Sequence, residues 1–161
     1  MFAMSHNIAL ETVAPRYVAG LEFSTSFATL SADMTTAINT LFRLLSDSGV
    51  TAIGPVIAVY TDKMHAERPW DCEVCVPIAE GADPHPELMM HKLRGGLMAT
   101  VMHKGSYGEL RNTHARSAAW FAEHGHTSAG PPREIYLNSP GEVAEDDLRT
   151  RIEFPVILAE K

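Results

Sequence analysis

Two tyrosines and a carboxylate stand at matched places in this sequence and could together bind an organic molecule. Tyr60 ends the segment PVIAVY, and Tyr136 ends the segment PREIY, in which Glu134 lies two residues earlier. If each segment is a strand, Glu134 and Tyr136 share one face, and so do Ala58 and Tyr60. Aromatic rings attract cations, and a carboxylate in an apolar cleft is screened little from positive charge. These residues predict a site for a flat organic molecule, cations included.

The alternation of apolar residues predicts which face of the sheet carries this site. In PREIYLNSP, Ile135 and Leu137 are the natural pair to face a helix, which leaves Glu134 and Tyr136 on the opposite face. Glu134 has a second interpretation, because a neighbouring strand could instead place Arg151 beside it as a structural ion pair. Both interpretations remain open at the level of sequence.

Further candidate ligand contacts come from a loop, from the start of a helix and from the last strand. Trp70, in the proline-flanked segment HAERPWD, either covers a groove or seals the edge of the sheet. Tyr107 precedes a predicted helix and could reach the mouth of a groove. Arg151 and Glu153 share one parity on the last strand, which adds charges of both signs to the candidate site.

An internal repeat positions these residues. The segment GVTAIGPVIAVY, from Gly49 to Tyr60, matches GHTSAGPPREIY, from Gly125 to Tyr136, at an offset of 76 residues. Two glycines, a proline and a tyrosine are conserved in spacing between the copies. The sequence therefore predicts two structurally equivalent modules.

Each copy of the repeat follows an amphipathic segment that predicts a helix. Apolar residues in the first copy recur at helical spacing, and the offset of 76 gives the corresponding inner face of the second helix. These faces are Met34, Ile38, Leu41, Phe42 and Leu45, and then Leu110, His114, Ser117, Ala118 and Phe121. The glycine that follows each segment, Gly49 or Gly125, predicts the end of the helix.

Strand-like runs complete each module. A strand-like run precedes each helix, namely RYVAGLEFST and LMATVMHKG. A second run follows each tyrosine segment and contains EVCVPI or IEFPVI. Loops are predicted at residues 61–70 and 80–96. The order strand, helix, strand, strand predicts an α+β fold in one domain spanning 1–161. We expect pseudo-symmetric modules at about 7–79 and 97–158, joined by a linker at 80–96, to face each other across a central ligand groove.

Composition excludes several classes of function. The 161 residues carry 20 acidic and 13 basic side chains, a net charge of -7 that disfavours nucleic acid and anionic membranes as direct partners. No helix-turn-helix pattern, secretory leader or long apolar run is recognisable, so we expect a cytoplasmic protein. A small molecule is the expected partner, and the sequence does not identify a protein partner.

Cysteine and histidine spacing predicts neither a cofactor nor a metal. Cys72 and Cys75 lie in a predicted strand, where their odd separation sends the thiols to opposite faces, so reduced structural thiols are expected. The eight histidines show no zinc-binding spacing. His114 is instead expected to be a semi-buried, hydrogen-bonded side chain on the inner face of its helix.

Three segments resemble a known family. HKGSYGEL, GPPREIYLNSP and RIEFPV are similar to the GyrI-like family, also described as the effector-binding domain of bacterial transcription activators. The resemblance implies two tandem modules around a groove that accepts varied aromatic compounds, with Glu134 at its centre and Tyr107 among the aromatic residues. It also implies a stand-alone member without the usual DNA-binding part. Arg151 and Glu153 depart from the family pattern, which places an acidic residue and then an aromatic one there.

Two classes of function follow from this resemblance. The first is a multidrug-binding or effector-binding protein that captures small aromatic or amphipathic molecules without changing them. The alternative is a hydrolase that opens cyclopropane-bearing DNA-alkylating compounds, with Glu134 as base and Tyr136 or Tyr107 as polarising donor. A lesser alternative is a gyrase-inhibitor-like partner protein.

Overall fold

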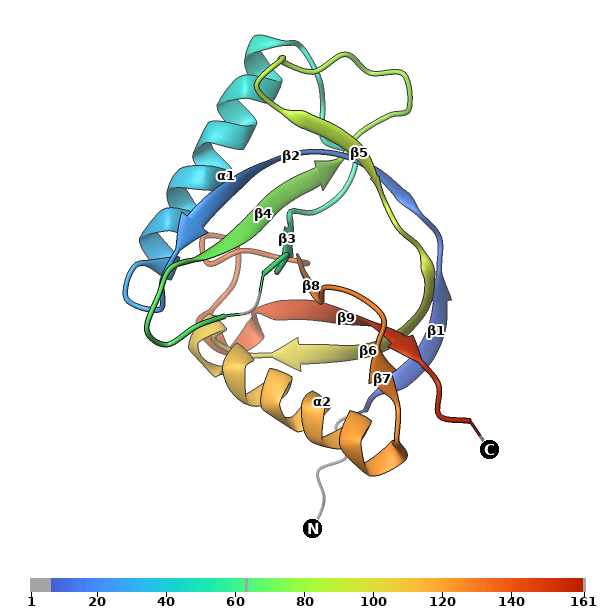
Figure 1. The fold of residues 1–161 in the computed structure, drawn as a ribbon. Coiled ribbons are helices and arrows are strands. Elements are labelled where there is room, and N and C mark those ends of the chain that lie inside the picture. Colours follow the sequence, from blue (N-terminus) through green and yellow to red (C-terminus); the bar gives the residue numbers. More distant parts are fainter. Residues whose placement is uncertain (1–6, 63, 161) are drawn as a thin grey trace. The chain divides into compact units, whose positions relative to one another are not determined.

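The computed structural model describes residues 7–62 and 64–160, which belong to two compact units (Figure 1). Unit 2 is one continuous segment, Ala14–Gly95, whereas unit 1 combines Met1–Val13 with Gly96–Lys161.

Unit 2 is an antiparallel sheet with one helix packed against it. Its elements are β2 (Arg16–Thr25), α1 (Leu30–Asp47), β3 (Ile57–Val59), β4 (Trp70–Pro77) and β5 (Met89–Leu93). The strands lie in the order β5-β2-β4-β3, and every neighbouring pair is antiparallel. Helix α1 packs on β2 and β4.

Unit 1 repeats this arrangement. Its elements are β1 (Ala9–Val13), β6 (Gly96–Lys104), the short helix η1 (Tyr107–Glu109), α2 (Leu110–His124), β7 (Thr127–Ser128), β8 (Arg133–Tyr136), the short helix η2 (Glu145–Asp147) and β9 (Arg149–Ile157). The strands lie in the order β1-β6-β9-β8, with β7 also paired to β9. The predicted α+β fold with two pseudo-symmetric strand-helix-strand-strand modules is thereby confirmed.

The strand pairings are equivalent in the two modules. Ile57 of β3 pairs with Cys75 of β4, and Arg133, 76 positions after Ile57 as the repeat predicts, pairs with Glu153 of β9, which lies two residues before Pro155 as Cys75 lies two residues before Pro77. The glycine stops are also confirmed, because Gly49 and Gly125 follow α1 and α2 with left-handed φ angles of 70° and 67°. Glycine adopts this conformation without the steric cost that a Cβ atom imposes.

The buried faces of the helices differ in chemistry. α1 buries apolar side chains, namely Ala37, Leu41, Leu44 and Leu45, against the sheet of unit 2. α2 buries Leu110, Thr113 and Ser117, so its inner face is partly polar. Phe42 was expected on the inner face and is 42% exposed, and Ala118 is also exposed. Both residues lie at the margin of the apolar stripe, where helical periodicity alone is a weak guide to burial.

Two local predictions were wrong. Residues 80–96 were expected to be a loop, yet Met89–Leu93 form the edge strand β5, whose mostly exposed residues lack the alternating pattern of a half-buried strand. Trp70 was assigned to a loop and is instead the first residue of β4. Cys72 and Cys75 do lie in a strand, β4, where both are buried.

Candidate functional site

The candidate site of unit 1 lies on the sheet face that α2 covers. Ile152, which is directly opposite Glu134 in the pairing of β8 with β9, packs against Leu110 of α2. Tyr136 shares this face, since it lies opposite Thr150. Glu134 and Tyr136 are therefore side by side as predicted, but the prediction that they face away from the helices was wrong. Leu137, which was expected to pack under a helix, is 44% exposed.

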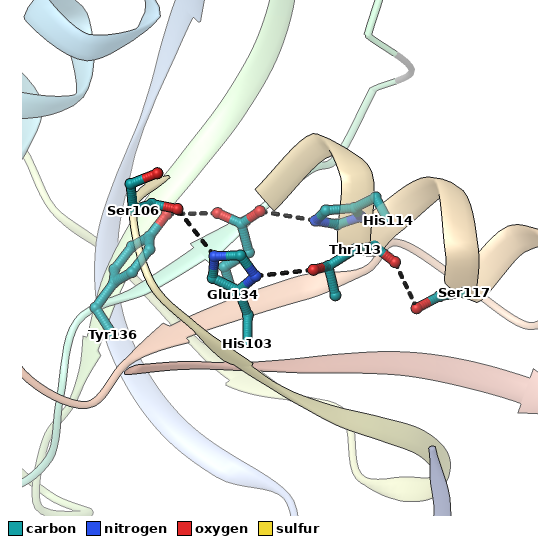
Figure 2. Close-up of polar contacts among 7 residues, drawn as sticks. All are labelled: His103, Ser106, Thr113, His114, Ser117, Glu134 and Tyr136. Carbon is teal, nitrogen blue, oxygen red and sulfur yellow. Dashed lines mark hydrogen bonds and ion pairs between the residues drawn. The ribbon is translucent and has the colours of Figure 1, made fainter. Parts of the chain in front are cut away.

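Glu134 is buried, and both of its carboxylate oxygens are hydrogen-bonded (Figure 2). The Tyr136 hydroxyl donates to Oε1 at 2.7 Å, and Nε2 of His114, on α2, lies 2.7 Å from Oε2. Hydrogen bonds to an ionised carboxylate are among the strong ones, worth roughly 1.5–3 kcal/mol each. Glu134 is therefore held in one position between β8 and α2.

Tyr107 and Tyr136 form an aromatic pair next to this carboxylate. Their ring centroids are 5.5 Å apart at an interplanar angle of 63°, and Tyr107 remains 38% exposed. Burial raises the pKa of Tyr107, and the negative charges of Glu134 and Glu142 raise it further. The Tyr107 hydroxyl therefore lies in a negative potential, an environment that favours a cation near the ring.

A hollow of about 390 Å³ lies beside Tyr107. Its walls come from the segment before α2 and from the loop before β9, namely Ser106, Tyr107, Gly108, Pro140, Glu145 and Leu148. An aromatic ring, a proline and a leucine give the hollow apolar surface, and Glu145 adds a carboxylate. This composition suits an organic ligand that carries positive charge.

His103 fixes the segment that carries Tyr107. Its Nε2 donates to the backbone oxygen of Ser106 at 2.9 Å, because a carbonyl can only accept, and its Nδ1 lies 2.8 Å from the Thr113 hydroxyl (Figure 2). Thr113 in turn accepts a bond from Arg116 at 3.0 Å. Buried His103 thereby ties β6 to α2 across the turn in which Tyr107 lies.

Thr150 lies in the middle of this polar face. It pairs with Tyr136 on β8 and with His103 on β6, and its side chain is completely buried. Among the residues that the structure describes, its hydroxyl has no hydrogen-bond partner. This hydroxyl is a buried polar group between two side chains of the candidate site.

Arg151 and Glu153 lie on the opposite face of the same sheet. Glu153 is completely buried, with its carboxylate 3.0 Å from Arg151 and 3.6 Å from Arg133, and Arg151 also lies 3.1 Å from Glu11. The alternative pairing of Glu134 with Arg151 was therefore wrong. The histidine on α2, rather than the arginine on β9, is the ion-pair partner of Glu134.

The candidate residues of unit 2 form an aromatic cluster. Trp70, 1% exposed, contacts the rings of Tyr60 and Phe27 at centroid distances of 6.0 and 5.9 Å. Ala58, opposite Val74, takes the place that Glu134 has in unit 1. The carboxylate site of unit 1 has no acidic counterpart at that position of unit 2.

The structure adds residues that sequence reasoning did not place in the site. His114 was correctly expected to be semi-buried and hydrogen-bonded, but its bond to Glu134 was missed because Glu134 was placed on the other face. His103, Thr113 and Thr150 were also missed. The offset of 76, which put His114 on the inner face of its helix, was the one usable signal.

Residues 7–62 and 64–160 contain no group of three or more His, Cys, Asp or Glu side chains arranged to hold a metal ion. No helix in the described part of the chain combines the length and the apolar character needed to span a membrane.

Solved structures share this fold across nearly the whole chain. The C-terminal domain of EcmrR matches with a TM-score of 0.85 at 22% identity, over 97% of this chain and 100% of that one. EcmrR in its complex with DNA matches with a TM-score of 0.82 at 22% identity, over 95% of this chain and 58% of that one. At 22% identity these two matches show the fold alone.

Two further structures show the same fold at lower identity. A hydrolase from Listeria innocua has a TM-score of 0.67 at 14% identity, covering 97% of this chain and 94% of its own. SAV2435 bound to tetraphenylphosphonium has a TM-score of 0.68 at 10% identity, covering 94% of both chains. At these identities the likeness shows the fold alone.

The family comparison covers most of the sequence. A search of curated proteins gives no match. The family model described as the GyrI-like small molecule binding domain matches residues 6–157. This match agrees with the resemblance of HKGSYGEL, GPPREIYLNSP and RIEFPV, and the chain belongs to the GyrI-like small molecule binding domain family.

Proposed function

We propose that this chain binds small aromatic or amphipathic organic molecules, cations among them, at the site formed by Glu134, Tyr136 and Tyr107. The observation that carries the proposal is a buried carboxylate hydrogen-bonded to a tyrosine whose ring contacts a second, partly exposed tyrosine. The rings supply apolar surface, and the carboxylate supplies negative charge where water screens it little.

Charge around Tyr107 supports a cationic ligand. The hollow beside it includes Glu145, and both Glu134 and Glu142 act electrostatically on its hydroxyl. A cation above an aromatic ring gains about 0.5–1 kcal/mol at an exposed site and about 2 kcal/mol where water is excluded. The fold neighbour SAV2435 was solved bound to tetraphenylphosphonium, an aromatic cation, which makes this compound a suitable probe.

Replacement of Glu134 by Gln tests the proposal. The substitution keeps the shape of the side chain and removes its charge, so tetraphenylphosphonium affinity, measured by calorimetry, should fall by about 1–3 kcal/mol. Triphenylphosphine oxide, an uncharged aromatic compound, should lose much less. Glu123→Gln, at an exposed position of α2, is the matched control and should bind like the parent. Unchanged affinity in Glu134→Gln would show that the carboxylate is not part of the site.

A second candidate function is hydrolysis of cyclopropane-bearing compounds. It is favoured by the hydrogen-bonded series Tyr136–Glu134–His114, in which a carboxylate is adjacent to a hydroxyl donor and an imidazole. Glu134 would take a proton from water as the water oxygen bonds to a ring carbon. The electron pair of the broken ring bond would pass to the rest of the ligand, which would receive a proton from Tyr136 or Tyr107.

The same variant separates the two functions. In a hydrolase, Glu134→Gln should bind a cyclopropane-bearing compound almost as well as the parent and lose turnover, because the base is absent. In a pure binding protein neither the parent nor the variant should produce the ring-opened product. Chromatography of the compound after incubation with each protein distinguishes these outcomes.

A further inference from the structure

His114 contacts Glu134, the carboxylate on which the proposed ligand binding depends. An imidazole can be neutral or positively charged, so the net charge of this pair can change. Its Nε2 lies 2.7 Å from Oε2 of Glu134, and the side chains are 14% and 3% exposed. The edge of the imidazole meets the ring of Phe154, with centroids 5.4 Å apart at 78°. The imidazole is thus enclosed by an apolar ring and a carboxylate, where little water separates the two charges.

Several other titratable groups lie on the elements around the pair. Burial and nearby carboxylates raise the pKa of Tyr107, so this hydroxyl is neutral near pH 7. His103, on β6, bonds to Ser106 and Thr113, and Arg116, on α2, donates to Thr113. Tyr136 contributes a neutral hydroxyl to Glu134. His114 is in direct contact with Glu134, so a proton gained or lost by its imidazole changes the net charge of this pair.

We propose that His114 determines which ligand charge the site accepts. When His114 is neutral, the His114–Glu134 pair carries one negative charge and attracts a cation. When His114 is protonated, the pair is neutral overall and favours uncharged ligands. This inference rests on the proposed function, since it assigns the regulation of the same site.

Thermodynamic linkage makes the inference quantitative. A cation that binds better to the deprotonated pair must displace the proton of His114, and protonation must weaken cation binding by the same factor. One linked proton changes the dissociation constant by at most about tenfold per pH unit. Cation affinity should therefore fall on acidification, whereas affinity for an uncharged ligand should not.

His114→Gln is the decisive variant. The Gln amide can donate to Glu134 as the imidazole does but cannot take up a proton. Tetraphenylphosphonium binding is measured by calorimetry at pH 8 and at pH 5.5 for the parent, His114→Gln and Glu134→Gln. We expect the parent to lose at least several-fold in affinity at the lower pH, and His114→Gln to change little. His124→Gln, at an exposed histidine of the same helix, is the control and should keep the pH dependence of the parent.

A second measurement does not depend on any variant folding correctly. Calorimetry of the parent near pH 6.5 in buffers of different ionisation enthalpy counts the protons released on binding. We expect release when tetraphenylphosphonium binds and none when triphenylphosphine oxide binds.

The results separate this inference from the proposed function. If His114→Gln keeps the pH dependence of the parent, or if the parent releases no proton, His114 does not set the charge of the site. The proposed function would still stand provided that Glu134→Gln weakens cation binding at pH 8. If Glu134→Gln binds the cation as the parent does, the site assignment fails and this inference fails with it.

Discussion

His91 donates from Nε2 to a carboxylate oxygen of Glu73 at 2.6 Å, although the strand β2 lies between the two strands that carry them. Gly20 makes this contact possible. Gly20 is the register partner of Cys75 on β4 and of Met89 on β5. A Cβ atom placed on Gly20 would lie 2.9 Å from Oε2 of Glu73. The carboxylate therefore crosses β2 through the space that a side chain would fill.

Unit 1 has an ion pair at the equivalent place with the charges exchanged. Arg151 lies four residues before Pro155 of β9, and Glu73 lies four residues before Pro77 of β4, so the two positions are equivalent. The Arg151 guanidinium lies 3.1 Å from the carboxylate of Glu11 on the edge strand β1. Thr100 takes the place of glycine on the central strand and donates to Glu11 at 2.6 Å. The long Arg151 side chain crosses β6 although that strand has no glycine at the position equivalent to Gly20. The two modules therefore share an ion pair across the central strand, although different residues form it.

Gly20→Ala should strongly destabilise unit 2. The added Cβ would lie 2.6 Å from both the Cβ of Cys75 and the backbone oxygen of Val74, and it would obstruct Glu73. We expect a loss of about 1–3 kcal/mol or more in the free energy of unfolding, measured by urea denaturation. Gly141→Ala is the control, because a Cβ there meets nothing within 4 Å. Equal stability of the two variants would contradict the steric account.

Glu11→Gln should reduce stability in a pH-dependent manner. The hydrogen bond from Thr100 and then the charge of Arg151 lower the pKa of Glu11 below 4.5. A lowered pKa in the folded state stabilises the fold above the ordinary carboxyl pKa, and this contribution disappears as the pH falls through the lowered value. The parent should therefore exceed Glu11→Gln in stability at pH 7, with the difference shrinking as the pH falls through the lowered pKa. Glu80→Gln, at an exposed position, should show no such trend in parallel urea titrations.

Thr150→Val should be tolerated despite complete burial of the side chain. The Thr150 hydroxyl has no hydrogen-bond partner among the described residues, so its replacement by a methyl group removes a desolvation cost without removing a bond. We expect a change between neutral and a gain of about 1 kcal/mol in thermal or chemical denaturation. Thr113→Val provides the contrast, because that hydroxyl bonds to His103 and Arg116, and it should cost about 1–3 kcal/mol. A large loss in Thr150→Val would indicate that the hydroxyl is bonded in solution.

Glu142→Gln should lower the pKa of Tyr107. Burial and then the charges of Glu134 and Glu142 raise this pKa above 10.0, so removal of one charge should move it back toward that value. The folded state holds the phenol proton of Tyr107 more tightly than the unfolded chain does. The protonated phenol therefore contributes to folding stability below pH 10, and this contribution is lost as the pH rises through the raised pKa. The change can be followed in NMR spectra of ring-labelled tyrosine, with Tyr107→Phe identifying the signal. Glu80→Gln should leave it unchanged.

The repeat made much of the fold predictable from sequence. Glycines such as Gly49 and Gly125 mark helix ends for a local steric reason, so their spacing reveals the order of elements without knowledge of tertiary structure. β5 was not predictable in this way. His91 and its exposed neighbours form an edge strand that is stabilised by pairing with β2 rather than by an apolar pattern of its own.

The site was predictable in its members but not in its orientation. Period-two alternation shows that Glu134 and Tyr136 share a face, but it identifies the helix side only when the other face is exposed. Here Arg133, Glu134 and Ile135 are all buried, so neither face is marked as the outer one. The partnership of Glu134 with His114 depends on packing between distant segments, which no local pattern encodes.

The pairing of β1 with β6 has a consequence for how the chain folds during synthesis. Unit 2 is continuous and all its strands are synthesised before β6, so it can close its own sheet without waiting for a later segment. β1 is synthesised before unit 2, but its partner strand β6 is synthesised after unit 2, since Ala9 pairs with Thr100. That contact closes a loop containing the whole of unit 2, and its entropic cost is smaller once the loop is already compact. We therefore expect unit 2 to act as the first folded intermediate, and unit 1 to be completed last by the two ends of the chain.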